Sequence, residues 1–185
     1  MMHKPQKWTI LSSEYLLKNK WCTVRVDKII SSNGNIIPNY FVLEYPDWIN
    51  VIAITKQHEF IFVYQYRHGA QECNYELTAG VCETTDNSPL ETAKRELLEE
   101  TGYGNGKWEQ LSVISANPGT HTNLCYCFVA TDVEEISTQQ LDPTEELMVV
   151  KFSLNEVKQL LMDDCIKQSM HAASLWKYLA INKLI

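Results

Sequence analysis

Alternating apolar and polar residues divide the first part of the chain into short strands. Residues 21–31, WCTVRVDKIIS, alternate in this way, and the turn signal NGN at 33–35 separates them from residues 39–45, NYFVLEY. This arrangement predicts a β-hairpin. Residues 49–55 and 60–66 are apolar runs on either side of a polar tetrapeptide, which predicts a second hairpin with a well-buried face.

The second half of the chain adds further strands and two closing helices. Three runs have the composition of strands: residues 108–115, 123–131 and 147–152. Residues 153–164 begin with Ser153 and Glu156 at the spacing of a capping box, which predicts a helix. Residues 169–185 carry apolar positions at helical period to the C-terminus, and we predict a second helix there.

The best-marked helix lies between these groups of strands. Ser88 stands in the N-cap position, Pro89 follows at the first helical position, and Gly102 occurs where a helix-terminating glycine belongs. Between these ends, Ala93 and Leu97 share one apolar face. A central helix enclosed by strands, with two more helices at the end, predicts an α/β sandwich with a mixed sheet.

The composition is that of a soluble globular protein. Of the 185 residues, 45% are hydrophobic and 21% charged, which suits one main domain over residues 47–185 and a small β-rich segment over residues 1–46. The net charge of −7 argues against nucleic-acid and anionic-membrane partners. No apolar run approaches 18 residues and the first ten residues do not resemble a signal peptide, so we expect a cytoplasmic protein.

Six scattered cysteines are interpreted as reduced thiols, because a chain of this size needs no disulfides. Cys125 and Cys127 lie on one face of a predicted strand, which favours burial over metal binding. The histidines, His171 among them, show no metal-ligand spacing.

Three glutamates gather within one turn of the central helix. Glu96, Glu99 and Glu100 border its apolar face, and a glycine-bearing loop precedes the helix. Repulsion between exposed neighbours on a helix costs only about 0.2–0.5 kcal/mol per pair, so a solvated face could carry them. In a partly desolvated cleft, the same carboxylates would suit a hard divalent cation, Mg²⁺ above all.

Residues 79–103, AGVCETTDNSPLETAKRELLEETGY, resemble the Nudix box. That pattern is Gly, five residues, Glu, seven residues, Arg-Glu, an aliphatic, any residue, Glu-Glu, any residue, Gly and an apolar residue. From Arg95 to Tyr103 every specified position matches. Counted from Gly80 the acidic position falls on Asp86, and counted back from Arg95 it falls on Asn87. We interpret this as one extra loop residue, with Asp86 covering for the missing glutamate.

The resemblance implies a mechanism and a set of roles. A metal-activated water would attack a phosphorus atom of a diphosphate. By position, Glu96 and Glu100 would be the main Mg²⁺ ligands, with Mn²⁺ as a substitute ion. Glu99 would share a second ion, and the carbonyl of Ala79 would add an oxygen. Arg95 would pair with a box glutamate and hold the loop.

The water also needs a general base from outside the helix. The acidic stretch LDPTEELMVV offers Glu145 and Glu146 just before a strand. Related pyrophosphatases carry the base or an extra metal ligand in this loop, so Glu145 is our candidate and Glu146 the second choice. An acidic loop in solvent is the structural alternative.

Three further matches resemble the branch that acts on ADP-ribose and nucleoside diphosphate sugars. Arg67 in VYQYRHG would fork onto the phosphates of the substrate. Glu76 in YELTAG would touch the substrate or brace the loop, although Thr78 replaces the usual proline. Pro118 in SANPGTHTN stands where ADP-ribose hydrolases typically place a proline.

Other side chains are candidates for the nucleoside part of the substrate. His121 and Asn123 could contact ribose or phosphate, although a loop histidine is commonly only solvated. Trp21 and Trp48 could stack on adenine, with core or interface packing as the alternative role.

We therefore predict a Nudix hydrolase that cleaves ADP-ribose to AMP and ribose 5-phosphate. The alternatives are another sugar nucleotide, such as ADP-glucose or GDP-mannose, or a dinucleoside polyphosphate. A non-enzymatic module that senses such a ligand is the remaining alternative, although the retained box acids favour catalysis. The resemblance also implies a homodimer formed through the N-terminal β segment.

Overall fold

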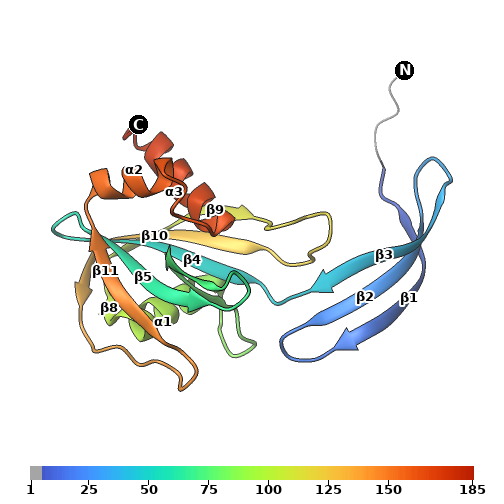
Figure 1. Ribbon diagram of the computed structural model, residues 1–185, viewed down its shortest axis with the longest axis horizontal. Helices are drawn as coiled ribbons and strands as arrows, with labels where there is room; N and C mark the ends of the chain where they lie inside the picture. Colours follow the sequence, from blue (N-terminus) through green and yellow to red (C-terminus); the bar gives the residue numbers. More distant parts are fainter. Residues whose placement is uncertain (1–5) are drawn as a thin grey trace. The chain divides into compact units, whose positions relative to one another are not determined.

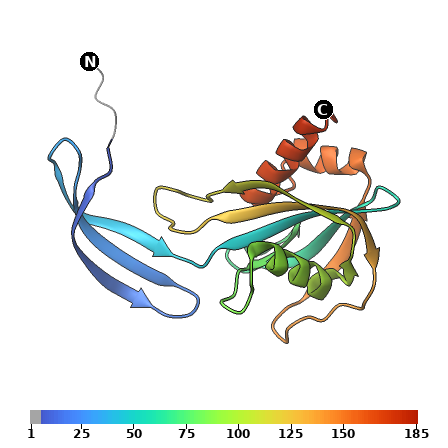
Figure 2. The same cartoon turned by 180° about the vertical axis from the view of Figure 1, so that it is seen from behind.

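A computed structural model describes residues 6–185, which form two compact units (Figures 1 and 2). The N-terminal unit extends to Pro46 and includes Asn117–Asn123. The C-terminal unit comprises Asp47–Ala116 and Leu124–Ile185. Residues 1–5, which belong to the predicted N-terminal β segment, lie outside the described residues.

The N-terminal unit is built on a three-stranded antiparallel sheet in the order β1-β2-β3. Its strands are β1 (Thr9–Lys18), β2 (Thr23–Ile30) and β3 (Ile36–Glu44). The β2–β3 hairpin confirms the first predicted hairpin. Strand β1 was not predicted, and its ten exposed residues explain why, since a strand with no buried face needs no alternating pattern.

The loop of residues 117–123 is hydrogen-bonded to the end of β3. The Leu43 N–H donates to the Thr120 carbonyl over 2.8 Å, and the Thr122 N–H donates to the Leu43 carbonyl over 3.1 Å. Asn123 adds a bond from its Nδ2 to the Pro46 carbonyl at 2.9 Å. These bonds explain why a segment distant in sequence belongs to the N-terminal unit.

The C-terminal unit contains an eight-stranded mixed sheet with the central order β11-β5-β4-β10-β8. These five strands are β4 (Trp48–Thr55), β5 (Phe60–Arg67), β8 (Tyr103–Gly104), β10 (Cys125–Glu135) and β11 (Leu147–Phe152). Three more strands pair with them: β6 (Glu72–Glu76) with β5, β7 (Thr78–Val81) with β4, and β9 (Lys107–Ile114) with β10. Strands β4 and β10 run parallel, whereas β4 and β5 are antiparallel, so the sheet is mixed as predicted.

Helices cover both faces of this sheet, as the two opposite views show (Figures 1 and 2). Helix α1 (Pro89–Thr101) lies on one face, and α2 (Leu154–Met162) and α3 (Ser169–Ile181) lie on the other. Strand β4 serves both layers: Val51 packs in the cluster of α1, whereas Ile52 packs in the cluster of α2 and α3. The predicted α/β sandwich is confirmed.

The helix ends follow the predicted capping chemistry. The Ser88 hydroxyl accepts a hydrogen bond from the Glu91 N–H at 3.3 Å, and Gly102 ends α1 in the left-handed conformation with a φ of 75°. Ser153 and Glu156 form the capping box of α2. Helix α3 ends at Ile181, short of the predicted end at residue 185.

The described part of the chain also bears on two predictions from composition. Within residues 6–185, no helix is both long and apolar enough to cross a lipid bilayer. All six cysteines fall in this range and are free thiols, as predicted. Cys125 and Cys127 are buried in the core beneath α2 and α3.

Candidate active site

The acidic end of α1 lies against the short strand β7, and Gly80 makes this approach possible. A Cβ atom at Gly80 would come within 2.2 Å of both the Cδ and Oε1 atoms of Glu96. Any larger residue would therefore displace the carboxylate. The glycine that opens the box pattern thus provides space for a box glutamate.

Glu100 is the most buried carboxylate of the cluster, with 7% of the residue exposed. The adjacent Ala79 backbone favours its charged form, but its Oε2 is buried without a hydrogen-bond partner among the described residues. Burial, followed by the charges of Glu96 and Glu145, raises the pKa of Glu100 well above its usual value. The orphaned oxygen indicates that this carboxylate lacks a cationic partner.

Glu96 is less buried than Glu100, but its pKa is raised by the same two causes, burial and neighbouring carboxylates. Burial raises its pKa to about 7, the adjacent Arg95 opposes the rise, and the charges of Glu99 and Glu145 add to it. The cluster therefore contains more carboxylates than the adjacent Arg95 can neutralise.

Arg95 lies between the loop and the helix. Its Nη1 is 3.0 Å from Oε1 of Glu96 and 2.9 Å from Oε2 of Glu99. On its other side, Nε donates to Oδ1 of Asp86 at 3.3 Å and Nη2 donates to Oδ2 at 3.2 Å. The guanidinium thus ties the box glutamates to the loop that precedes the helix.

Asp86 is the acid that this longer loop presents to Arg95. It also accepts hydrogen bonds from the Thr92 hydroxyl at 2.8 Å and from the Glu83 N–H at 3.1 Å, both through Oδ2. The Arg95 guanidinium lowers the pKa of Asp86 to about 2. Asn87 is exposed, so Asp86 is the residue that braces the loop.

Glu145 and Glu146 both lie exposed in the loop before β11. The Asp142 N–H donates to Oε2 of Glu145 at 3.0 Å, and the Glu145 N–H donates back to the Asp142 carbonyl at 2.8 Å. The charge of Glu145, and not that of Glu146, is among those that raise the pKa values of Glu96 and Glu100. This loop turn therefore presents Glu145 to the cluster.

Arg67 and Glu76 form a two-pronged ion pair across β5 and β6. Arg67 donates from Nε to Oε1 at 2.8 Å and from Nη2 to Oε2 at 2.6 Å, and Glu76 is 4% exposed. The side chain of Arg67 is 48% exposed, and its charge favours ionisation of Glu100. One edge of the guanidinium is therefore occupied by Glu76, whereas Nη1 takes no part in this pair.

The remaining predicted substrate contacts are divided between the two units. Trp21, which is 76% exposed, Pro118 and His121 belong to the N-terminal unit. The His121 ring lies against Tyr45, with ring centroids 5.3 Å apart. Trp48 belongs to the C-terminal unit, where it is half-buried and packs against the core beneath α2 and α3.

Glu96, Glu99 and Glu100, here called the box cluster, have the oxygen donors that a divalent cation requires. Within residues 6–185, no three His, Cys, Asp or Glu side chains already converge on a single metal position. Glu99 is turned toward Arg95, whereas Glu96 and Glu100 lie one helical turn apart next to β7. Their oxygen donors, the orphaned Oε2 and the excess negative charge fit a hard divalent cation after side-chain rotation.

Sequence reasoning missed one buried residue next to this region. His171, 2% exposed on α3, accepts a hydrogen bond at Nδ1 from the Leu77 N–H at 3.2 Å. A single histidine in an apolar helix carries no motif, and only the folded structure reveals its contact.

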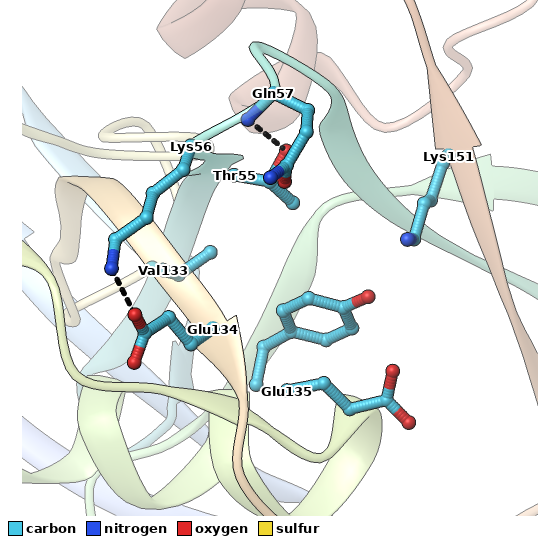
Figure 3. A pocket seen from close by; sticks show the side chains of 8 residues that line it. Thr55, Lys56, Gln57, Val133, Glu134, Glu135 and Lys151 are labelled. Carbon is cyan, nitrogen blue, oxygen red and sulfur yellow. Dashed lines mark hydrogen bonds and ion pairs between the residues drawn. The ribbon is translucent and has the colours of Figure 1, made fainter.

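Two cavities lie elsewhere in the C-terminal unit, and none of the predicted site residues lines them. The first, of about 270 Å³, is shown in Figure 3. Its Lys56 is paired with Glu134, and its Lys151 lies 3.4 Å from Glu59. The second, of about 250 Å³, has apolar walls that include Leu90 and Trp108. The charges of the first cavity are largely compensated, in contrast to those of the box cluster.

Comparisons with known proteins agree with this geometry. The family model for the nucleoside diphosphate sugar hydrolase N-terminal domain matches residues 8–43, and that for the NUDIX domain matches residues 45–172. The chain is 28% identical over 160 residues to the methanol dehydrogenase activator of Bacillus methanolicus, covering 86% of this chain and 85% of the relative. It is 26% identical over 152 residues to the ADP-ribose pyrophosphatase of Bacillus subtilis, covering 82% and 81%.

The fold has a counterpart among solved structures. The crystal structure of an ADP compounds hydrolase superposes with a TM-score of 0.86 at 24% identity, covering 98% of this chain and 97% of the other. Nudix hydrolases generally use a divalent metal ion. With a domain match over residues 45–172 and the box residues gathered around Gly80, this chain belongs to the Nudix family.

Proposed function

We propose that this protein is a Mg²⁺-dependent hydrolase that cleaves the diphosphate bond of a nucleoside diphosphate sugar, with ADP-ribose giving AMP and ribose 5-phosphate. The observation that carries the proposal is the pair of glutamates beside Gly80, Glu100 buried and Glu96 partly buried, whose negative charge exceeds the positive charge of their basic partners. A structural ion-pair network would instead be balanced, as it is around Asp86.

Four groups would hold the cation. They are the carboxylates of Glu96, Glu99 and Glu100 and the backbone carbonyl of Ala79. The bound cation would neutralise the diphosphate and lower the pKa of water. All of these donors are hard oxygens, which suit Mg²⁺, with Mn²⁺ as a substitute ion. Arg95 forms ion pairs with Glu96 and Glu99 and with Asp86 of the loop, and so holds the loop against the helix.

Glu145 is the proposed general base. It is exposed and therefore accessible to water, and its charge acts on both Glu96 and Glu100. The turn with Asp142 fixes the loop from which it projects. Glu146 lacks this electrostatic connection and is the second choice.

Arg67 would bind a substrate phosphate through the edge that Glu76 leaves available. Glu76 fixes the plane of the guanidinium, which reduces the freedom lost when a phosphate binds. In the N-terminal unit, Trp21, Pro118, His121 and Asn123 remain candidate substrate contacts. Trp48 remains a candidate in the C-terminal unit, with core packing as its observed role.

ADP-ribose is favoured by the names of the relatives and by the match to a nucleoside diphosphate sugar hydrolase N-terminal domain. A panel of ADP-ribose, ADP-glucose, GDP-mannose and diadenosine polyphosphates, with and without Mg²⁺, tests this choice. Release of AMP and ribose 5-phosphate from ADP-ribose at the highest kcat/KM is expected. Faster cleavage of another compound would reassign the substrate, and the absence of Mg²⁺-dependent cleavage of all of them would contradict the proposal.

We further propose a homodimer that forms through the N-terminal unit. Strand β1 exposes Ile10, Leu11, Leu16 and Leu17, each about half-accessible, and apolar surface of this kind favours burial against another chain. Sedimentation should give twice the mass of 21.3 kDa. A monomer at micromolar concentration would refute this part alone. The six free cysteines favour a reducing compartment, and we place the protein in the cytoplasm.

A regulatory role is the second candidate. One relative is named for activation of methanol dehydrogenase, so a member of this family can carry a regulatory name. Binding of ADP-ribose to this chain without Mg²⁺-dependent turnover would favour a ligand-sensing module over a hydrolase.

A further inference from the structure

The chain changes its sheet partner at Leu77, between the Arg67–Glu76 pair and the box. Glu76 ends β6 and pairs in register with Val63 of β5, whereas Thr78 begins β7 and pairs with Val51 of β4. Leu77 lies between the two strands and is 1% exposed. Its amide is thus buried at a point where neither ladder continues, so it needs another acceptor.

His171 provides that acceptor. Its Nδ1 lies 3.2 Å from the Leu77 N, so the imidazole accepts a hydrogen bond from the peptide where the strands change. Burial lowers the pKa of His171 to about 4, with Arg67 adding to the decrease and Glu76 opposing it. A neutral ring with the proton on Nε2 leaves Nδ1 available as the acceptor.

The peptide held in this way connects two parts of the candidate site. On one side, Glu76 orients Arg67. On the other side, the backbone of Ala79 lies close to Glu100 and favours its charged form, and Gly80 lies against Glu96. A displacement of the Leu77 peptide would therefore move the phosphate-binding arginine and the metal-binding backbone together.

We propose that His171 is a positioning residue of the active site: through the Leu77 N–H it fixes the β6–β7 crossing, and with it the alignment of Arg67 and Ala79 relative to the box glutamates. The catalytic part of this inference rests on the proposed function. The alternative is that His171 only fills the core beneath α3.

Matched variants separate the two roles. In His171→Asn, the carboxamide oxygen occupies nearly the place of Nδ1 and can accept the same hydrogen bond. In His171→Gln, the oxygen is one bond farther out, and His171→Leu removes the acceptor. Leu179→Ala, two turns farther along α3 and fully buried, is a control that loosens the same helix but keeps the His171 side chain as the acceptor for the Leu77 N–H.

We expect His171→Leu to lower kcat on ADP-ribose by about 100-fold, since misplacement of a site by about 1 Å can have an effect of this size. His171→Asn should remain within about threefold of wild type and His171→Gln should fall between, because hydrogen-bond geometry decides the alignment. Leu179→Ala should lower the melting temperature but leave kcat unchanged at a temperature where the protein is folded. Equal kcat values for the asparagine and glutamine variants would overturn the proposal, even if the leucine variant does not fold.

Two readouts do not depend on turnover. The Leu77 amide should exchange with deuterium faster in His171→Gln than in His171→Asn, and the affinity for Mn²⁺ in the absence of substrate should follow the same order. If the wild type cleaves none of the panel substrates, the proposed function fails, and these two measurements still decide whether His171 positions the metal-binding backbone. Identical exchange and affinity in both variants would contradict the inference.

Discussion

The loop before helix α1 and the C-terminal half of the helix carry carboxylates in opposite electrostatic states. Next to the first turns of α1, Asp86 receives hydrogen bonds from Arg95, Thr92 and the Glu83 N–H, and its pKa falls to about 2. Farther along the same helix, burial and neighbouring carboxylates raise the pKa of Glu96 to about 7. Their surroundings thus shift the pKa values of two nearby carboxyl groups in opposite directions, below the usual 3.8 for Asp86 and above the usual 4.5 for Glu96.

This difference separates a structural cluster from a functional one. Around Asp86 the charges are balanced, so the cluster holds the loop without a ligand. Around Glu96 and Glu100 an oxygen remains unpaired and negative charge accumulates, which lowers the stability of the empty site and favours a cation. Variants in the first cluster should therefore affect folding, and variants in the second should affect catalysis.

The largest effect is expected for Glu100→Gln. Loss of a main metal ligand should lower kcat on ADP-ribose by about 1,000-fold, or roughly 4 kcal/mol. The metal-free protein should become more stable, because the substitution removes a buried charge without a cation. Steady-state kinetics and thermal melting measure the two effects. Glu91→Gln, at an exposed position of the first turn of α1, is the matched control and should change neither.

The pH dependence of metal-free stability should reveal Glu96. Its folded pKa of about 7 lies above the usual 4.5, so the unfolded chain loses this proton first as the pH rises. Glu96 should therefore reduce stability by about 2–3 kcal/mol between pH 4.5 and 7. His171, with a folded pKa of about 4 below the usual 6.5, acts in the opposite direction, because stability is lost as the pH falls below 6.5.

The difference between wild type and Glu96→Gln isolates the glutamate, since His171 is common to both. Urea unfolding from pH 4.5 to 7 without metal should show the variant gaining stability relative to wild type as the pH rises. If the difference in unfolding free energy between the two proteins stays constant across this range, folding does not raise the pKa of Glu96.

Glu145 and Glu146, neighbours in the loop before β11, allow a second comparison between a proposed catalytic carboxylate and one without a proposed role. Glu145→Gln should lower kcat by about 100-fold, the usual scale for a general base, whereas Glu146→Gln should change it by less than about threefold. If Glu146→Gln has the larger effect, the base has been assigned to the wrong side chain.

The smallest effect on the rate is expected in the balanced cluster. Asp86→Ala should reduce stability by about 1–2 kcal/mol, because Arg95 loses a partly buried partner, and should lower kcat by less than about tenfold. The contribution of this ion pair is present above the unfolded pKa of about 3.9 and is lost as the pH falls toward 2. The requirement for Mg²⁺ should remain.

Counted back from Arg95, the acidic position of the box falls on Asn87, so Asn87→Ala is the control for this alternative alignment. Asn87 is exposed. The substitution should leave stability unchanged in denaturant melts. A greater loss of stability for Asn87→Ala than for Asp86→Ala would reverse the assignment of the bracing residue.

The sequence predicted those features that depend on local pattern. The ends of α1 follow from Ser88 and Gly102, and the apolar run of β4 follows from burial on both of its faces. The acidic sector was likewise visible from helical spacing. Such features require only neighbours along the chain.

The remaining features depend on contacts between distant residues. The exposed strand β1 has no buried face to produce a pattern, and the change of sheet partner at Leu77 leaves no signature in residues 72–81. The fork of Arg67 on Glu76 and the contact of His171 with Leu77 arise only when separate elements pack together.

Hydrolysis of ADP-ribose by chelator-treated protein, before and after Mg²⁺ is restored, tests most directly whether the acidic end of α1 exists to hold a divalent cation. We predict no turnover with chelator present and full recovery with excess Mg²⁺, together with a rise in melting temperature that Glu100→Gln does not show. Hydrolysis that continues unchanged in the chelator would contradict the account.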